Sequence, residues 1–492
     1  MKDLREKTIR GGAARIAAQA ANFGLRIGSL MILARLLQPR DFGLVGMVTA
    51  FTGVLDLFRD FGLSAAAIQR KDISEAQVST LFWINLSVGA LLCVLAEVLA
   101  PLVASFYHEP RLATVTAVLG FGFLLNAAGV QHSAILQREM RFTALAVINT
   151  VSLVLGIAVA VAGALAGYGY WALVAMTLTL PFTATIGFWA AARWVPGLPR
   201  RGAGIRSMMH FGGTLTLNGL LAYCAYNLDK ILLGRFWGAD ALGIYGRAYQ
   251  LTNIPTSNLN TAAGEVAFSA LSRIQDDPPR FRDYFLKGYS LVLAITIPIT
   301  IACMFFAPDI IRVILGPRWN SATPILRLLA PTILVFGIIN PVGWLMTSLG
   351  LVTRSLKLSL IFAPLITMGY ILGVPHGPSG VAIGFSSVML LCSIPLTVFC
   401  VRGTPVSLKD ILITTAAPLG SALVGGVAAF AVRMAWGHSL PALPRLAVES
   451  TVLFGVFATL LLFVAGQKSF YLGLVRSLMY RAPVQDKTAA TA

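Results

Sequence analysis

The chain has 492 residues, of which 57% are hydrophobic and only 12% are charged, and its formal net charge is +18. Soluble domains carry about 25% charged residues, so this composition excludes a water-soluble protein. The lysines and arginines lie mostly in short segments between apolar runs. A nucleic-acid-binding protein would gather them on one soluble face, so nucleic acid is not an expected partner.

The apolar runs follow one another along the whole chain, and each is long enough to cross a hydrocarbon layer of ~30 Å as a helix. Backbone polar groups cannot stay unpaired in lipid, so we expect helices throughout. The predicted fold is an all-α, polytopic membrane protein with about fourteen transmembrane helices. The predicted spans are 12–37, 42–66, 78–105, 111–131, 142–166, 168–192, 210–236, 241–271, 284–306, 323–349, 354–373, 378–400, 411–435 and 447–466.

The basic residues predict the orientation of these helices. With the N-terminus inside, the cytoplasmic segments hold 24 lysines and arginines, and the opposite segments with their flanks hold 8. This positive-inside bias predicts an even number of helices with both termini cytoplasmic, in a multi-pass protein of the inner (plasma) membrane. The opposite set is Arg35, Arg40, Arg111, Arg235, Arg312, Arg318, Arg433 and Arg445.

Two internal matches indicate a repeat. The segment ILARLLQPRDFGLVG (32–46) matches LLGRFWGADALGIYG (232–246) at an offset of 200, and APLVASFYHEP (100–110) matches APDIIRVILGP (307–317) at an offset of 207. The first match aligns Leu33 with Leu233, Arg35 with Arg235, Gly43 with Gly243 and Gly46 with Gly246. Both matches occur in the same order in each half, which predicts two parallel six-helix repeats.

The repeat divides the chain into three predicted parts. Residues 1–200 form an N-terminal six-helix lobe, and residues 201–405 form a C-terminal six-helix lobe. Residues 406–492 contribute two extra transmembrane helices and a cytoplasmic tail. Such an arrangement is typical of a two-lobed transporter with a central cavity between the lobes.

Ionisable side chains inside the spans cost about 2.5–3.5 kcal/mol each to insert, and are therefore functional candidates. They concentrate in the opening helices of each predicted lobe, which places the expected polar cavity between helices 1–2 and 7–8. A guanidinium group donates two parallel hydrogen bonds to a phosphate and stays charged at any working pH. The predicted diphosphate-binding residues are Arg26, Arg59, Arg247 and Lys230.

Acidic residues in the same helices are candidates for binding a coupling proton or sodium ion. They are Asp229, Glu265, Asp56, Asp60 and Glu97. A structural interpretation stays open beside this one. Arg59 could form ion pairs with Asp56 and Asp60, and Lys230 with Asp229. Asp229, Glu265 and Glu97 could also be hydrogen-bonded structural carboxyls.

The cysteines and histidines do not predict a metal or a cofactor. None of the five cysteines forms a C-x-x-C pair or lies near a histidine at metal-ligand spacing. We interpret the cysteines as small buried hydrophobic residues.

Four segments resemble a known family. They are ILARLLQPRDFGLVGMVTAF (32–51), DLFRDFGLSAAAIQRKDIS (56–74), STLFWINLSVG (79–89) and GVQHSAILQREMRF (129–142). They are similar to the polysaccharide transporter family of Wzx-type oligosaccharide flippases, within the multidrug/oligosaccharidyl-lipid/polysaccharide exporter superfamily. The resemblance is strongest to the branch that serves colanic acid and succinoglycan-type exopolysaccharides.

The resemblance implies two six-helix lobes with V-shaped alternating access and a cargo of undecaprenyl-diphosphate-linked oligosaccharide repeat units. It also implies cavity arginines on the first, second and eighth helices, which would here be Arg26, Arg59 and Arg247. The implied role is a flippase, not an enzyme, in exopolysaccharide or lipopolysaccharide biosynthesis in the bacterial inner membrane. A polysaccharide polymerase and export proteins are the candidate protein partners.

Two other functions remain as alternatives. A cation-coupled multidrug exporter of the same superfamily needs an acidic lumen, whereas the basic groups here are at least as numerous as the acidic ones. A membrane polymerase or ligase for the same lipid-linked sugars usually carries a large periplasmic loop. The longest external gap here, near residues 307–322, is short.

Overall fold

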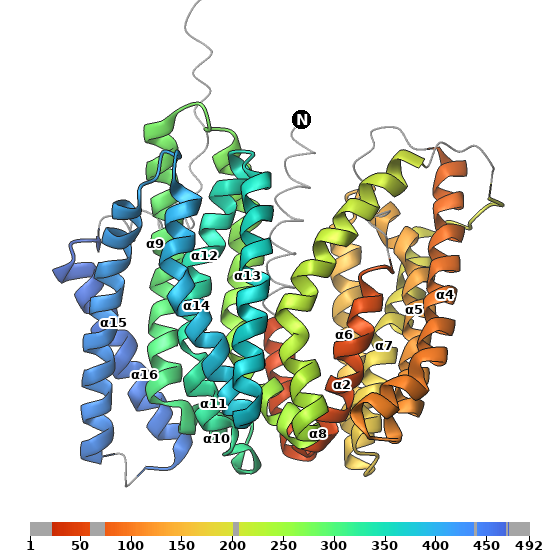
Figure 1. The fold of residues 1–492 in the computed structure, drawn as a ribbon, viewed down its shortest axis with the longest axis horizontal. Coiled ribbons are helices and arrows are strands. Elements are labelled where there is room, and N and C mark those ends of the chain that lie inside the picture. The colour runs from red at the N-terminus through yellow and green to blue at the C-terminus, as the bar shows by residue number, and fades with distance from the viewer. Residues whose placement is uncertain (1–21, 60–73, 200–205, 437–439, 469–470, 472–492) are drawn as a thin grey trace, which may run out of the picture. The chain divides into compact units, whose positions relative to one another are not determined.

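The computed structural model describes residues 22–59, 74–199, 206–436, 440–468 and 471. Every regular element within these residues is a helix (Figure 1). The main helices are a helix at 22–36, α2 (Pro39–Asp56), α4 (Glu75–Tyr107), α5 (Arg111–Arg138), α6 (Phe142–Leu165), α7 (Tyr170–Ala192), α8 (Arg206–Ser272), α9 (Pro278–Phe305), α10 (Ala307–Ile314), α11 (Ala322–Leu329), α12 (Pro331–Ser348), α13 (Val352–Gly373), α14 (Gly377–Val401), α15 (Leu408–Trp436) and α16 (Ala442–Thr459).

The prediction of an all-α, polytopic membrane protein is confirmed. Each predicted span overlaps a described helix; α8 accounts for the seventh and eighth spans, and α11 with α12 for the tenth. In the described part of the chain, 9 helical stretches are long and apolar enough to cross a membrane, and one of them, Lys357–Val401, covers both α13 and α14. Helix α4 exposes Leu91, Val98 and Leu102, as expected of a surface that meets lipid.

Three boundaries differ from the predicted ones. Helix α2 ends at Asp56 instead of residue 66, and the end of that span lies outside the described residues. The predicted gap between the seventh and eighth spans shrinks to a break at Gly238, where φ is 78°. The predicted external gap near 307–322 contains α10 and the short 3₁₀ helix Pro317–Trp319.

Contacts divide the chain into two compact units. Unit 1 comprises Met1–Gln250, Ile311–Leu329 and Leu356–Met389, and unit 2 comprises Leu251–Ile310, Ala330–Ser355 and Leu390–Ala492. The predicted division into lobes at residues 200 and 405 follows the order of the helices along the chain, which these contacts do not test. It stays a prediction.

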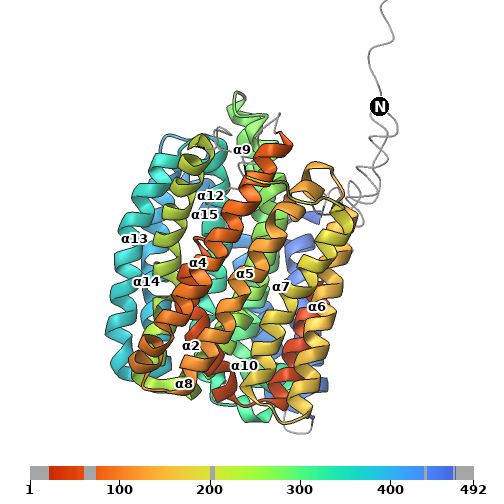
Figure 2. The same cartoon turned by 90° about the vertical axis from the view of Figure 1, so that its right-hand side faces the viewer.

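In unit 1, helices α4, α5, α7 and α6 lie side by side in that order (Figure 2). Helix α4 begins with a capping box, in which the backbone N–H of Gln77 donates to Ser74 Oγ at 3.3 Å and the Ser74 N–H donates to Gln77 Oε1 at 3.0 Å. Such a box satisfies two of the otherwise unpaired donors at the first turn. The end of α4 is set by His108, which adopts the left-handed conformation with φ 55°.

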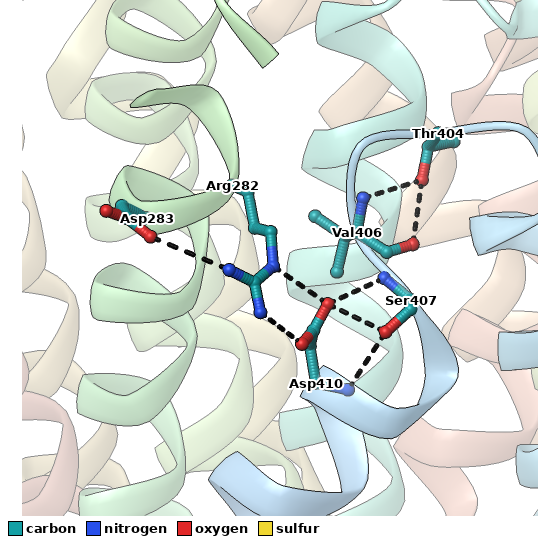
Figure 3. Close-up of polar contacts among 6 residues, drawn as sticks. All are labelled: Arg282, Asp283, Thr404, Val406, Ser407 and Asp410. Carbon is teal, nitrogen blue, oxygen red and sulfur yellow. Dashed lines mark hydrogen bonds and ion pairs between the residues drawn. The ribbon is translucent and has the colours of Figure 1, made fainter. Parts of the chain in front are cut away.

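In unit 2, α9 packs against α12 and α15, and α15 packs against α16. Figure 3 shows how the start of α15 is attached to α9: the guanidinium of Arg282 donates to both carboxylate oxygens of Asp410. Asp410 also accepts hydrogen bonds from the backbone N–H and the hydroxyl of Ser407, at 2.9 and 2.7 Å. One carboxylate therefore caps α15 and links it to its neighbour.

Candidate functional site

Arg59 lies in the turn directly after α2, in unit 1, and lines a cavity. Its Nη1 donates to Asp56 Oδ1 at 3.0 Å, while its Nε has no hydrogen-bond partner among the described residues. The cavity has a volume of about 220 Å³ and lies between this turn and helices α5 and α7. Its other polar lining residues are Asn126, Ser133, Gln137 and Thr185. Within the described residues, the ion pair with Asp56 thus leaves one donor of Arg59 without a partner.

Arg247 lies on the second half of α8 and is half-buried against α2. Its guanidinium carbon lies 4.3 Å from the centroid of the Phe42 ring, and its Nη1 donates to Gln250 Oε1. Its Nε has no hydrogen-bond partner in the described part of the chain. Arg247 therefore combines a cation–π contact with a donor that is still available.

Arg26 lies on the helix at 22–36, and its side chain is exposed. The residue is held in a regular turn, since the hydroxyl of Ser29 donates to the carbonyl of Arg26 at 2.9 Å. Its part in diphosphate binding, like that of the other predicted residues, stays a prediction.

Asp229 and Lys230 lie on the first half of α8 and make different contacts. Asp229 is fully buried and accepts hydrogen bonds from the Tyr245 hydroxyl and from the Lys230 N–H, both at 2.8 Å. The Lys230 ammonium donates to Asn227 Oδ1 at 2.6 Å and lies 5.4 Å from the centroid of the Tyr249 ring. Asp229 therefore has the surroundings of a hydrogen-bonded structural carboxyl, the alternative that its sequence left open.

The remaining candidates for ion coupling are not gathered in one place that the structure describes. Glu97 is exposed on α4, where Cys93 Sγ lies 3.8 Å from its Oε1. Asp60 lies outside the described residues, as does the side chain of Glu265 in α8. Within the described residues, no group of three or more His, Cys, Asp or Glu side chains could hold a metal ion.

A second cavity in unit 1, of about 430 Å³, lies between α2, the first half of α8 and α13. Tyr223 anchors one wall, because its hydroxyl lies 3.2 and 3.1 Å from the carbonyl oxygens of Thr49 and Ala50 on α2. Helices α2 and α8 were expected to line a cavity. Helix α13 was not, because the α13 residues that line this cavity carry no charge that would have marked them in the sequence. Cys224 also lines this cavity and is exposed, so interpreting every cysteine as buried was wrong.

Sequence reasoning missed a buried charge network in unit 2. Asp309 and Glu449 have relative exposures of 0% and 1%. Arg433 Nη1 lies 3.2 Å from Asp309 Oδ2 and 3.7 Å from Glu449 Oε1, and Arg445 Nε donates to Asp309 Oδ1 at 3.1 Å. A signal was available: at the offset of 207, Asp309 aligns with Leu102, which is exposed on α4. A carboxylate in place of a lipid-facing leucine indicates a covered face.

Comparisons with known proteins find a matching family, relatives in sequence and a solved structure with a similar fold. The profile of a family described as polysaccharide biosynthesis protein matches residues 32–324. The lipopolysaccharide biosynthesis protein WzxC of Escherichia coli K12 is 31% identical over 402 residues, covering 80% of each chain. The teichuronic acid biosynthesis protein TuaB of Bacillus subtilis 168 is 33% identical over 298 residues, covering 59% of this chain and 61% of its own. A structure of the lipid II flippase MurJ in an inward closed conformation is 14% identical with a TM-score of 0.71, covering 95% of this chain and 100% of its own, which shows a shared fold.

Proposed function

The chain belongs to the polysaccharide biosynthesis protein family, as a Wzx-type flippase of the multidrug/oligosaccharidyl-lipid/polysaccharide exporter superfamily, and from this we propose its cargo. The cargo is an undecaprenyl-diphosphate-linked oligosaccharide repeat unit, moved across the bacterial inner membrane for exopolysaccharide or lipopolysaccharide biosynthesis. The proposal includes two six-helix lobes (1–200 and 201–405), a C-terminal helix pair and tail (406–492), and both termini in the cytoplasm. It gives the chain the role of a transporter without catalytic activity, with a polymerase and export proteins as partners.

The observation that carries the proposal is the position of Arg59. An unpaired diphosphate cannot enter hydrocarbon at a tolerable cost in free energy. Arg59 Nε lies beside a cavity with amide and hydroxyl side chains and has no hydrogen-bond partner among the residues that the structure describes. A diphosphate could replace Asp56 on this guanidinium as a bidentate partner, while Asn126 and Thr185 lie within the same cavity for sugar hydroxyls.

The membrane potential can drive such a transfer without a nucleotide. When the inside is negative, each negative charge that moves outward moves with the membrane potential and releases ~2.3 kcal/mol per 100 mV. Two charges at about 150 mV therefore gain roughly 7 kcal/mol.

Reconstitution into proteoliposomes tests the proposal. The probe is a fluorescent undecaprenyl-diphosphate oligosaccharide, and the measurements are its protection from an impermeant quencher and its chain length. We expect transfer between leaflets without chain growth. Chain growth would assign the protein to the polymerase class, and transport of organic cations in place of the lipid would assign it to the drug exporters.

A pair of variants tests the role of Arg59. Arg59→Ala should lower the transfer rate about 10- to 100-fold, because a hydrogen bond to a charged group contributes about 1.5–3 kcal/mol. Asp56→Ala removes the ion pair but keeps the guanidinium, and should leave the rate within about threefold of the parent, less than such a bond contributes. Equal losses in both variants would show that Arg59 acts only through its ion pair with Asp56.

A further inference from the structure

The two predicted repeats contain the same helix break. Before α2 the chain leaves the helix at 22–36, and Gln38 is extended, with φ −91° and ψ 157°. Helix α8 is interrupted at Gly238, where φ is 78° and ψ is −175°, a conformation that favours glycine. Residues 38 and 238 differ by 200, the offset of the first sequence match. The break therefore recurs at equivalent positions.

Directly after these breaks, α2 and the second half of α8 touch backbone to backbone. A Cβ atom at Gly43 would lie 1.7 Å from the carbonyl oxygen of Ala239, and one at Gly243 would lie 1.9 Å from the carbonyl oxygen of Pro39. Residues 39 and 239 are also equivalent at the offset of 200. Each repeat thus presents the same glycine to the same carbonyl of the other, as in an isologous interface. Only residues without a side chain allow this approach.

Two equivalent arginines make a second exchanged contact in unit 1. Arg35 Nη2 donates to the carbonyl oxygen of Val313 at 2.7 Å. The Arg235 Nη1 lies 2.9 Å from Nδ1 of His108, and its guanidinium carbon lies 5.7 Å from the centroid of the Phe106 ring. At the offset of 207, Phe106 is equivalent to Val313. Arg235 therefore reaches the end of α4, the third helix of the first repeat, and Arg35 reaches the equivalent position in α10, directly after the third helix of the second repeat.

We propose that the glycine contact and the arginine contact together form a latch at the end of unit 1 where α2 begins and α4 ends. The latch holds this end shut and parts when the cargo leaves there. At Gly43 and Gly243 themselves the two backbones meet with no side chain between them. The neighbouring side-chain contact of Arg247 with the Phe42 ring has to part together with the glycine contact. Arg35 is exposed, so water can replace its hydrogen bond. Two equivalent contacts can also part together in one rigid-body movement. The latch rests on the proposed transport function, and its residues position the helices instead of binding the cargo.

Labelling of Cys224 tests the latch without measuring transport. This native cysteine lines the cavity between α2, α8 and α13, and the other four cysteines are first replaced by alanine. In the parent, an impermeant maleimide should label Cys224 from one side of the membrane. Gly43→Ala or Gly243→Ala should raise labelling from the opposite side about tenfold, because the added Cβ holds the latch apart and shifts the population. Gly246→Ala is the matched control, since a Cβ there meets nothing within 4 Å.

Cross-linking supplies a second test that does not depend on the glycine variants folding. The experiment uses a cysteine-free background and introduces one pair of cysteines at a time, either Arg35→Cys with Val313→Cys or Arg235→Cys with His108→Cys. A short bifunctional methanethiosulfonate then joins the two cysteines of the pair. We expect transfer of the fluorescent lipid to fall at least about tenfold, as for a protein held in one state, and to recover on reduction. The control pair, Trp83→Cys with Gly197→Cys, joins residues of one repeat that are already hydrogen-bonded at 2.9 Å, and should leave transfer unchanged.

The outcomes separate the latch from the proposed cargo. One-sided labelling in both glycine variants, or parent-like transfer in either cross-linked pair, would overturn the latch and leave the flippase proposal intact. Altered labelling in a protein that moves no lipid-linked oligosaccharide would overturn the cargo proposal and support the latch.

Discussion

The hydroxyl of Tyr245 donates a hydrogen bond to the fully buried carboxylate of Asp229 at 2.8 Å, across the break at Gly238. This bond joins the two halves of α8 at the point where the backbone ladder is interrupted. Tyr245→Phe removes the donor and leaves a buried oxygen without it, so the free energy of unfolding should fall by about 1–3 kcal/mol. Thermal unfolding of the purified protein in detergent measures the effect. Tyr168→Phe, at an exposed tyrosine, is the control and should change nothing measurable.

The same carboxylate distinguishes ion coupling from a structural role. Asp229→Asn removes the charge, but the amide oxygen can still accept the Tyr245 hydrogen bond. Because the surroundings of Asp229 are those of a structural carboxyl, we expect this variant to respond to proton and sodium gradients in the same way as the parent. The measurement is the transfer rate in proteoliposomes with and without each gradient. Loss of gradient dependence with normal insertion would assign the coupling site to Asp229.

The helices were predictable because each span is an apolar run of membrane-crossing length, a property of the local sequence alone. The repeat was also visible, since Arg35 and Arg235 share their neighbours at a fixed offset. The reciprocal contact of Gly43 and Gly243 was not predictable, because similarity between two segments does not show how close they lie in the fold. Helix ends that depend on a single residue, such as Gly238, were placed only to within a few residues.

The site was less predictable than the fold. Charges in apolar spans pointed to Arg59 and Arg247, but the stacking of Arg247 on Phe42 joins residues 205 positions apart. The charge network at Asp309 was missed because Arg433 and Arg445 were counted as interfacial residues. Positive charge near a span end sets topology in most proteins, and sequence alone does not show when it also pairs with a buried acid.

Arg26 and Arg247 provide a test of the predicted diphosphate site. Arg26→Ala or Arg247→Ala should insert normally but stop polymer export in cells, because a guanidinium is then missing along the path of the headgroup. Membrane fractionation and polymer yield are the measurements. Phe42→Leu is a control for Arg247, since it removes the ring at 4.3 Å but keeps the charge, and should retain most of the export. Normal export by the inserted Arg26→Ala protein would remove Arg26 from the mechanism.

The network around Asp309 predicts a large difference between two arginine variants in unit 2. Arg445→Ala leaves a fully buried carboxylate with one arginine fewer, and should lower the free energy of unfolding by about 3–5 kcal/mol. Arg282→Ala breaks a pair whose arginine is 44% exposed, and should lower the free energy of unfolding far less. Thermal or denaturant unfolding in detergent compares them.

A double variant tests whether the buried charge itself causes the loss. Adding Asp309→Leu to Arg445→Ala installs the residue found at the equivalent position 102, and leaves Arg433 to pair with Glu449 at 3.7 Å. Replacing a buried ion pair by apolar residues is often neutral or stabilising, so stability should recover by at least about 2 kcal/mol. If the double variant were as unstable as Arg445→Ala alone, the loss would come from the missing packing of the arginine stem and not from an uncompensated carboxylate.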